Sequence, residues 1–120
     1  MELLPKILVA LVALEHCYIL WLEMFVWTTR GPKVFKSLSK DLFVPTKALA
    51  ANQGLYNGFL AAGLFWSLLI QDIVWADNVA IFFLSCVIVA GIYGGLTAGK
   101  RIFYVQAIPA ILALISVILL

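Results

Sequence analysis

Apolar residues fall into four long runs along the chain, and short polar stretches separate them. The runs cover residues 4–28, 48–70, 76–98 and 102–120. Each is close to the roughly 20 residues that an α-helix needs to cross a bilayer. Strands of a membrane barrel would instead alternate apolar and polar residues over about ten positions. The pattern therefore predicts an all-α polytopic membrane protein, a compact bundle of four transmembrane helices forming one domain over residues 1–120.

The composition agrees with a membrane protein. Hydrophobic residues make up 65% of the 120 residues and charged residues 12%, whereas soluble domains average about 25% charged residues. The first run is longer than the roughly 7–15 apolar residues of a secretory signal, so we expect it to be retained as a span. Cys17 and Cys86 both fall inside apolar runs, which favours free buried thiols over a disulfide.

Basic residues are concentrated in two of the three connections between the runs. Seven of the eight Lys and Arg residues lie at residues 30–47 and 100–101, whereas residues 71–78 contain two Asp and no basic residue. The positive-inside rule then places both basic connections in the cytoplasm and both termini outside. Because topology accounts for these cations, nucleic acid is not an expected partner. Residues 34–43 (VFKSLSKDLF) could form a short amphipathic helix on the membrane surface or a solvated loop.

The first apolar run contains ionisable side chains where hydrocarbon would be expected. Glu15, His16 and Glu23 occur within ALEHCYILWLEMFVW, and at 100° per residue they share one helix face with Trp27. A charged side chain at the bilayer centre costs about 2.5–3.5 kcal/mol on the insertion scale, so such residues face the bundle interior or a wet cavity. The alternative to a functional role is structural hydrogen bonding.

The second run carries amides in place of carboxylates. Asn52, Gln53, Tyr56 and Asn57 gather on one side of the expected helix, while small residues recur every four positions on another side. Small residues allow close helix approach, so we expect that other side to be a packing surface and the amide side to line a polar pocket. We expect Glu23 to lie level with Asn52, and the pocket to open to the cytoplasm. The predicted ligand- or proton-binding residues, drawn from all four helices, are Glu15, His16, Glu23, Trp27, Asn52, Gln53, Tyr56, Asn57, Tyr93 and Gln106.

The third and fourth runs contain packing signals. Glycines recur in AGIYGGLTAG (residues 90–99), which predicts either a tight helix contact within the bundle or a surface for homo-oligomer formation. Pro109 lacks an N–H group and is expected to kink the fourth helix near Gln106.

The segments EHCYILWLEMFVW and LAANQGLYNGFLAAGLFW carry a family resemblance. The chain resembles a bacterial family of small four-span membrane proteins of unknown function, domain-of-unknown-function family 1304, over nearly its whole length. The resemblance implies a multi-pass protein of a bacterial plasma membrane and carries no activity with it. The residues that match the family's recurrent motifs are Glu15, His16, Glu23, Trp27, Asn52, Gln53, Gly54, Tyr56, Asn57 and Gly58.

These features favour a transporter or proton-coupled carrier, with the lipid bilayer and a small molecule or ion as partners. Glu15 or Glu23 would bind a proton or a cation in exchange, and His16 would tune or relay the proton. The alternatives are an intramembrane enzyme acting on a lipid-like molecule, a metal site, and an assembly protein. A metal would need ligands from several helices, and the chain has a single histidine. No cofactor and no catalytic residue is identified, and an enzyme is the less favoured class.

Overall fold

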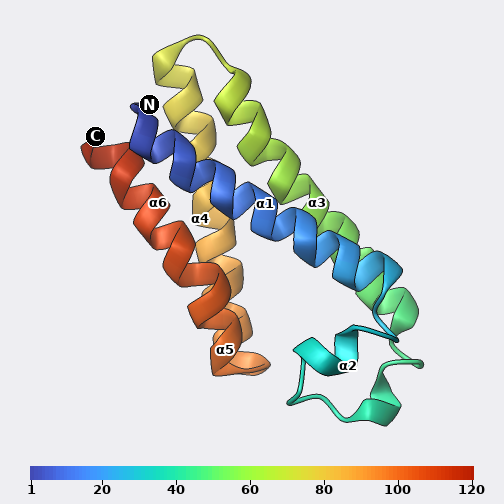
Figure 1. Cartoon of the computed structure of the whole chain (residues 1–120). Coiled ribbons are helices and arrows are strands. Elements are labelled where there is room, and N and C mark those ends of the chain that lie inside the picture. The colour runs from blue at the N-terminus through green and yellow to red at the C-terminus, as the bar shows by residue number, and fades with distance from the viewer. The chain divides into compact units, whose positions relative to one another are not determined.

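The computed structural model describes all residues, 1–120, and every regular element in it is helical. The α-helices are α1 (Leu3–Phe25), α2 (Gly31–Val34), α3 (Lys47–Leu69), α4 (Ile73–Thr97), α5 (Lys100–Ile102) and α6 (Ile108–Leu119), with a 3-10 helix at Lys40–Leu42 and a π-helix, η2, at Phe103–Ala107 (Figure 1). The predicted all-helical class is confirmed. The long helical segments fall within a few residues of the four apolar runs.

Three of the long helical segments are long and apolar enough to cross a membrane. They are α1, α4 and the continuous segment Lys100–Leu119 formed by α5, η2 and α6. Helix α3 has the same length as α1, 23 residues. Its three side-chain amides make it more polar, and it is not among the candidate spans.

The chain folds as two compact units. The central unit is Glu15–Phe59, and the terminal unit combines Met1–Leu14 with Leu60–Leu120. Helices α1 and α3 each contribute one half to each unit. The two units are described separately below.

The terminal unit has a core of small and branched apolar side chains. The N-terminal half of α1 and the C-terminal half of α3 supply part of it, and α4 and α6 supply the rest. The buried members are Val9, Val12, Ala13, Leu64, Ala80, Leu84, Val87, Ala110, Ala113 and Val117. Both ends of the chain lie at the same end of this unit (Figure 1). Burial of this apolar area excludes water or lipid from the helix contacts and holds the four segments together.

The glycines of α4 pack against η2 and the residue before it. A Cβ atom on Gly91 would lie 2.8 Å from the backbone nitrogen of Ala107, and one on Gly95 would lie 2.7 Å from Phe103 Cβ. A Cβ on Gly94 would lie 2.8 Å from Ile102 Cγ2. The glycine pattern therefore serves a tight contact within the chain, which is the first of the two predicted uses.

The irregularity expected near Pro109 takes the form of the π-helix that ends two residues before it. Proline has no N–H to donate to the carbonyl four residues earlier, so regular α-helical bonding cannot continue through this point. A π turn is one of the known ways in which a helix absorbs such a defect. Gln106 lies inside this π-helix.

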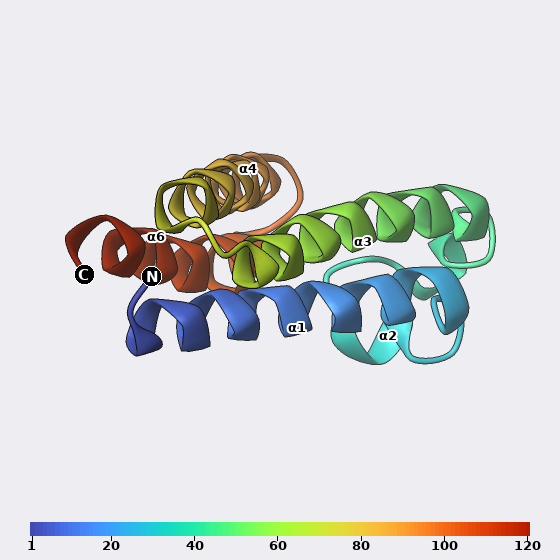
Figure 2. The same ribbon diagram turned by 90° about the horizontal axis from the view of Figure 1, so that it is seen from above.

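The central unit joins α1 to α3 through a folded cap, residues 26–46. The indole of Trp27 packs against the rings of Phe35 and Phe43, at centroid distances of 5.4 and 4.8 Å. Its Nε1–H donates to Thr46 Oγ1 at 3.0 Å. Phe43 is only 1% exposed. Figure 2 shows this segment, with α2, at one end of the α1 and α3 helices.

The cap corrects one of the two expectations for the first connection. The amphipathic helix over residues 34–43 is not formed, because α2 ends at Val34 and the 3-10 turn covers only Lys40–Leu42. A small aromatic core organises the connection instead of a helical apolar stripe.

Candidate functional site

A buried carboxylate in the central unit forms the centre of the candidate site. Glu23, in the last two turns of α1, is 5% exposed. The Nδ2 amide of Asn57, from α3, donates to Glu23 Oε1 at 2.7 Å and also approaches the Gln53 carbonyl oxygen at 3.2 Å. Asn57 is itself 9% exposed. The carboxylate and amide stripes of the two helices therefore meet, but through Asn57, five residues beyond the expected Asn52.

Small residues of α3 make this contact close. A Cβ on Gly54 would lie 3.0 Å from Glu23 Cβ and 2.7 Å from Met24 Cγ. A Cβ on Gly58 would lie 2.5 Å from Leu20 Cδ1. We expected the small-residue side to be separate from the polar site, whereas Gly54 packs directly on the glutamate. The reason is geometric, because positions 54, 57 and 58 are three and four residues apart and share one face of a helix.

Glu15 and His16 lie two turns earlier on α1. His16 is 1% exposed. Glu15 is partly buried, and its Oε1 atom is inaccessible and has no hydrogen-bond partner. At 1.5 Å per residue, Glu15 and Glu23 are about 12 Å apart along the helix axis. The central unit therefore contains two carboxylates with unsatisfied bonding capacity along one helix.

Four other predicted residues of α3 and the cap form no hydrogen bond with Glu23, whose side-chain partner is Asn57. Asn52 and Gln53 are exposed, and the Asn52 amide donates to the Ala48 carbonyl oxygen of its own helix at 2.8 Å. Tyr56 is 65% exposed. Trp27 belongs to the aromatic core of the cap. The structure therefore shows one amide, that of Asn57, hydrogen-bonded to Glu23, where the sequence predicted a row of amides lining a pocket.

The two predicted residues from the later helices belong to the terminal unit. Tyr93, in α4, is 60% exposed. Gln106, in η2, is partly buried. Within that unit neither is hydrogen-bonded to a carboxylate.

The Glu23–Asn57 pair leaves part of the hydrogen-bonding capacity of the carboxylate unused. An ionised carboxylate offers about four lone-pair positions, and one amide donor satisfies only one of them. No Lys or Arg nitrogen forms an ion pair with Glu23, and the Met1 amino group forms its ion pair with Asp77. No three His, Cys, Asp or Glu side chains converge in the manner of metal ligands. Cys17 and Cys86 are free thiols, as predicted, but neither is buried as expected, because Cys17 is exposed and Cys86 is partly exposed.

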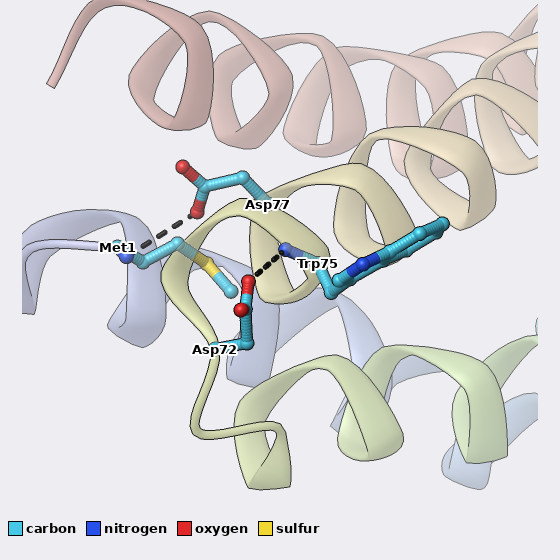
Figure 3. A network of polar contacts seen from close by, with 4 residues as sticks. All are labelled: Met1, Asp72, Trp75 and Asp77. Carbon is cyan, nitrogen blue, oxygen red and sulfur yellow. Dashed lines mark hydrogen bonds and ion pairs between the residues drawn. The ribbon is translucent and has the colours of Figure 1, made fainter.

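A second polar feature, which the sequence did not indicate, is a hollow of about 270 Å³ in the terminal unit. Met1 and Asp77 line this hollow, and Asp77 Oδ1 lies 3.3 Å from the Met1 amino nitrogen (Figure 3). Asp72 caps α4 by accepting the backbone N–H of Trp75 at 3.0 Å. Both aspartates thus have a structural use. The sequence places Asp72 and Asp77 in a polar connection, but the pairing of Asp77 with the Met1 amino group is seen only in the structure.

Comparisons with known proteins identify relatives without an assigned activity. The sequence model of the family described as "Protein of unknown function (DUF1304)" matches residues 10–118. The uncharacterized protein YpaA of Lactococcus lactis subsp. lactis (strain IL1403) is 36% identical over 118 residues, which cover 97% of this chain and 98% of that protein. No solved structure matches the chain.

Proposed function

We propose that this chain, which belongs to the DUF1304 family, is a small integral membrane protein that binds a proton or a cation at Glu23 and Glu15. In this proposal it works as a transporter or proton-coupled carrier, in which the two carboxylates load and release the ion. His16, buried between them along α1, tunes or relays the proton.

The observation that carries the proposal is the isolation of Glu23. This carboxylate is 5% exposed and has one neutral side-chain donor, Asn57. A buried charge without a counter-charge is strongly destabilising, and native proteins avoid it unless the group is neutralised or paired. The missing partner is therefore a proton on the carboxyl group or a cation beside it. The orphaned Oε1 of Glu15 supports the same inference.

Helix length and charge distribution support the membrane part of the proposal. Three segments are candidate spans, and α3 has the length of a fourth. In a bundle the Asn57 amide would be tolerated because it is bonded to Glu23 rather than facing lipid. The basic cap and the Lys100–Arg101 turn would lie in the cytoplasm and both termini outside.

The first experiment measures the proton itself. Infrared difference spectra of the reconstituted protein between high and low pH should contain the carbonyl band of a carboxylic acid that forms on acidification. Glu23→Gln and Glu15→Gln should each remove part of this band. Glu2→Gln removes an exposed carboxylate and is the control that shows how much of the band a solvent-accessible group contributes. An unchanged band in both site variants would overturn the proposal.

A flux experiment tests transport. Tetraphenylphosphonium serves as the probe cation in liposomes that carry a proton gradient. Exchange of the probe for protons should depend on Glu15 and Glu23 and should be lost in either Gln variant. Because only the ionised carboxylate attracts a cation, binding of the probe should weaken as the pH falls in the wild-type protein and become independent of pH in the double Gln variant. Flux that persists in the double variant contradicts a carrier role for these residues.

A further inference from the structure

One cation of the cap is held in a fixed position on the outer side of α1. The Nε–H of Arg30 donates to the Tyr18 hydroxyl oxygen at 2.9 Å. The guanidinium carbon lies 5.8 Å from the centre of the Tyr18 ring and 5.9 Å from that of Trp21. The two rings are themselves in contact, at 5.8 Å between centroids. Arg30 thus reaches back along α1 and is oriented by a hydrogen bond and two cation–π contacts.

These contacts use the Nε–H of Arg30 and leave its two terminal Nη groups available to donate hydrogen bonds. The terminal Nη groups of the guanidinium have no carboxylate partner, because none of the basic residues of the cap forms an ion pair. The Tyr18 oxygen accepts from Nε, so its own O–H remains available to donate, and arginine has no acceptor to take it. A phosphate group, which only accepts, complements such a set of donors. Planar guanidinium groups bind phosphate through two parallel bonds.

The surroundings identify which phosphate is expected. Tyr18, Trp21 and Phe25 lie within about 60° of one another around α1, and they are 40%, 43% and 70% exposed. Tyr and Trp side chains, such as Tyr18 and Trp21, are enriched at the headgroup level of bilayers. The neighbouring cap adds three lysines, Lys33, Lys36 and Lys40, against one aspartate, Asp41, and Lys47 follows at the start of α3. A positively charged surface next to an exposed apolar face complements a phosphate attached to acyl chains.

We propose that Arg30, Tyr18 and Trp21 form a binding site for the phosphate headgroup of an anionic phospholipid. The site rests on the membrane location in the proposed function and not on ion binding at Glu23. The phosphodiester accepts from the Arg30 Nη groups and the Tyr18 hydroxyl, while Trp21 and Phe25, which lie closer to the cap end of α1, contact the headgroup region. The surrounding lysines attract anionic lipid to the surface without selecting its orientation.

The test compares charge-conserving substitutions by native mass spectrometry of the full chain. Phosphatidylglycerol and phosphatidylcholine are added to the detergent-solubilised protein, and the population of bound lipid is measured. Arg30→Lys keeps the charge but removes the fork and the Nε donor, and should weaken phosphatidylglycerol binding about tenfold. Lys33→Arg conserves charge at an exposed cap position without aromatic contacts and should leave binding unchanged. Tyr18→Phe keeps the ring and removes the hydroxyl, and should weaken phosphatidylglycerol binding to a smaller extent. It is the variant to measure if Arg30→Lys does not fold.

Three results would overturn the site. They are equal binding of the two lipids by the wild-type protein, unchanged phosphatidylglycerol binding in the folded variants, and equal competition by inorganic phosphate, which would indicate a site for the free anion. Failure of the lipid site can be distinguished from failure of the proposed ion-binding function. Loss of the proton band in Glu23→Gln with no lipid preference refutes only the lipid site, whereas a protein that does not insert into bilayers refutes both.

Discussion

Glu23 is positioned by two residues of α3 that act in different ways. Asn57 donates a hydrogen bond to its carboxyl oxygen, and Gly54 lets the two backbones approach. The sequence identified all three residues as members of the site or of its packing surface. It could not say which amide pairs with which carboxylate, because that depends on the relative rotation and shift of two helices. Asn52 and Asn57 are chemically equal, and only the close packing at Gly54 brings Asn57 to Glu23.

The first prediction separates these two amides. Asn57→Ala removes the side-chain donor of a buried carboxylate and should lower the free energy of unfolding by roughly 1–3 kcal/mol. Asn52→Ala removes an amide that is exposed and bonded to its own helix, so it should change stability by less than about 0.5 kcal/mol. Thermal denaturation in detergent, or in mixed micelles with a denaturant, measures the difference. Equal effects of the two variants would mean that the Glu23–Asn57 bond does not contribute to stability.

A second prediction concerns shape at the same residue. Glu23→Gln retains an oxygen that can accept from Asn57, so this variant should fold with nearly wild-type stability while losing the titrating group. Glu23→Leu removes the acceptor and leaves the buried Asn57 amide with only the Gln53 carbonyl oxygen at 3.2 Å, at a cost of about 1–3 kcal/mol. Melting temperatures of the two variants, measured at one pH, check the order. A less stable Gln variant than Leu variant would contradict it.

At the scale of elements, the positions of the long helices followed from the apolar runs, because a run of about 20 apolar residues has few other stable conformations. The structure of the cap could not be predicted from the apolar runs. Its structure depends on contacts of Trp27 with Phe35 and Phe43, which are eight and sixteen residues away in sequence, and no continuous helix or strand connects the three rings. Long-range aromatic packing of this kind leaves no local signal.

The third prediction tests the hydrogen bond that closes the cap. Thr46→Val removes the acceptor of the Trp27 indole N–H and should destabilise the cap by about 1–2 kcal/mol. Amide hydrogen exchange of residues 26–46 should accelerate, while exchange in α4 should stay unchanged. Thr29→Val is the control, since the Thr29 hydroxyl is exposed and bonds only to Val26 of its own turn. Equal exchange rates in both variants would mean that the hydrogen bond between Trp27 and Thr46 does not stabilise the cap.

The fourth prediction concerns the contact between α4 and η2. Gly91→Ala places a methyl group 2.8 Å from the Ala107 backbone nitrogen, and a backbone cannot yield as a flexible side chain can. The variant should lose about 1–3 kcal/mol of stability. Gly99→Ala is the matched control, because nothing lies within 4 Å of the added atom. Thermal denaturation of the two variants compares them, and an equally stable Gly91→Ala protein would exclude a tight contact.

At the scale of the whole molecule, orientation is the property that the charge distribution predicts most directly. The basic residues gather in the cap and in the Lys100–Arg101 turn, and the connection between α3 and α4 carries Asp72 and Asp77. We propose that the cap side faces the cytoplasm. This orientation also decides which leaflet supplies the lipid for Arg30 and from which side an ion reaches Glu23.

The fifth prediction tests this orientation. A reporter that is active only in the cytoplasm should be silent when fused to the C-terminus, and an alkaline phosphatase fusion at the same place should be active. Replacing the cap lysines by glutamine should increase the fraction of inverted molecules, because the charge bias falls. A cytoplasmically active C-terminal reporter in the wild-type chain would reverse the proposed sidedness.

The glycine contact of α4 also has a consequence for the order in which the protein is assembled. Gly95 and Phe103 are eight residues apart in sequence, and Gly91 and Ala107 are sixteen apart. Contacts between such near neighbours require little loop closure and form early. We therefore expect α4 and the segment that follows it to leave the biosynthetic machinery as a preformed hairpin rather than as two successive helices. Force measurements on nascent chains of increasing length would then record one insertion event for residues 73–119 instead of two.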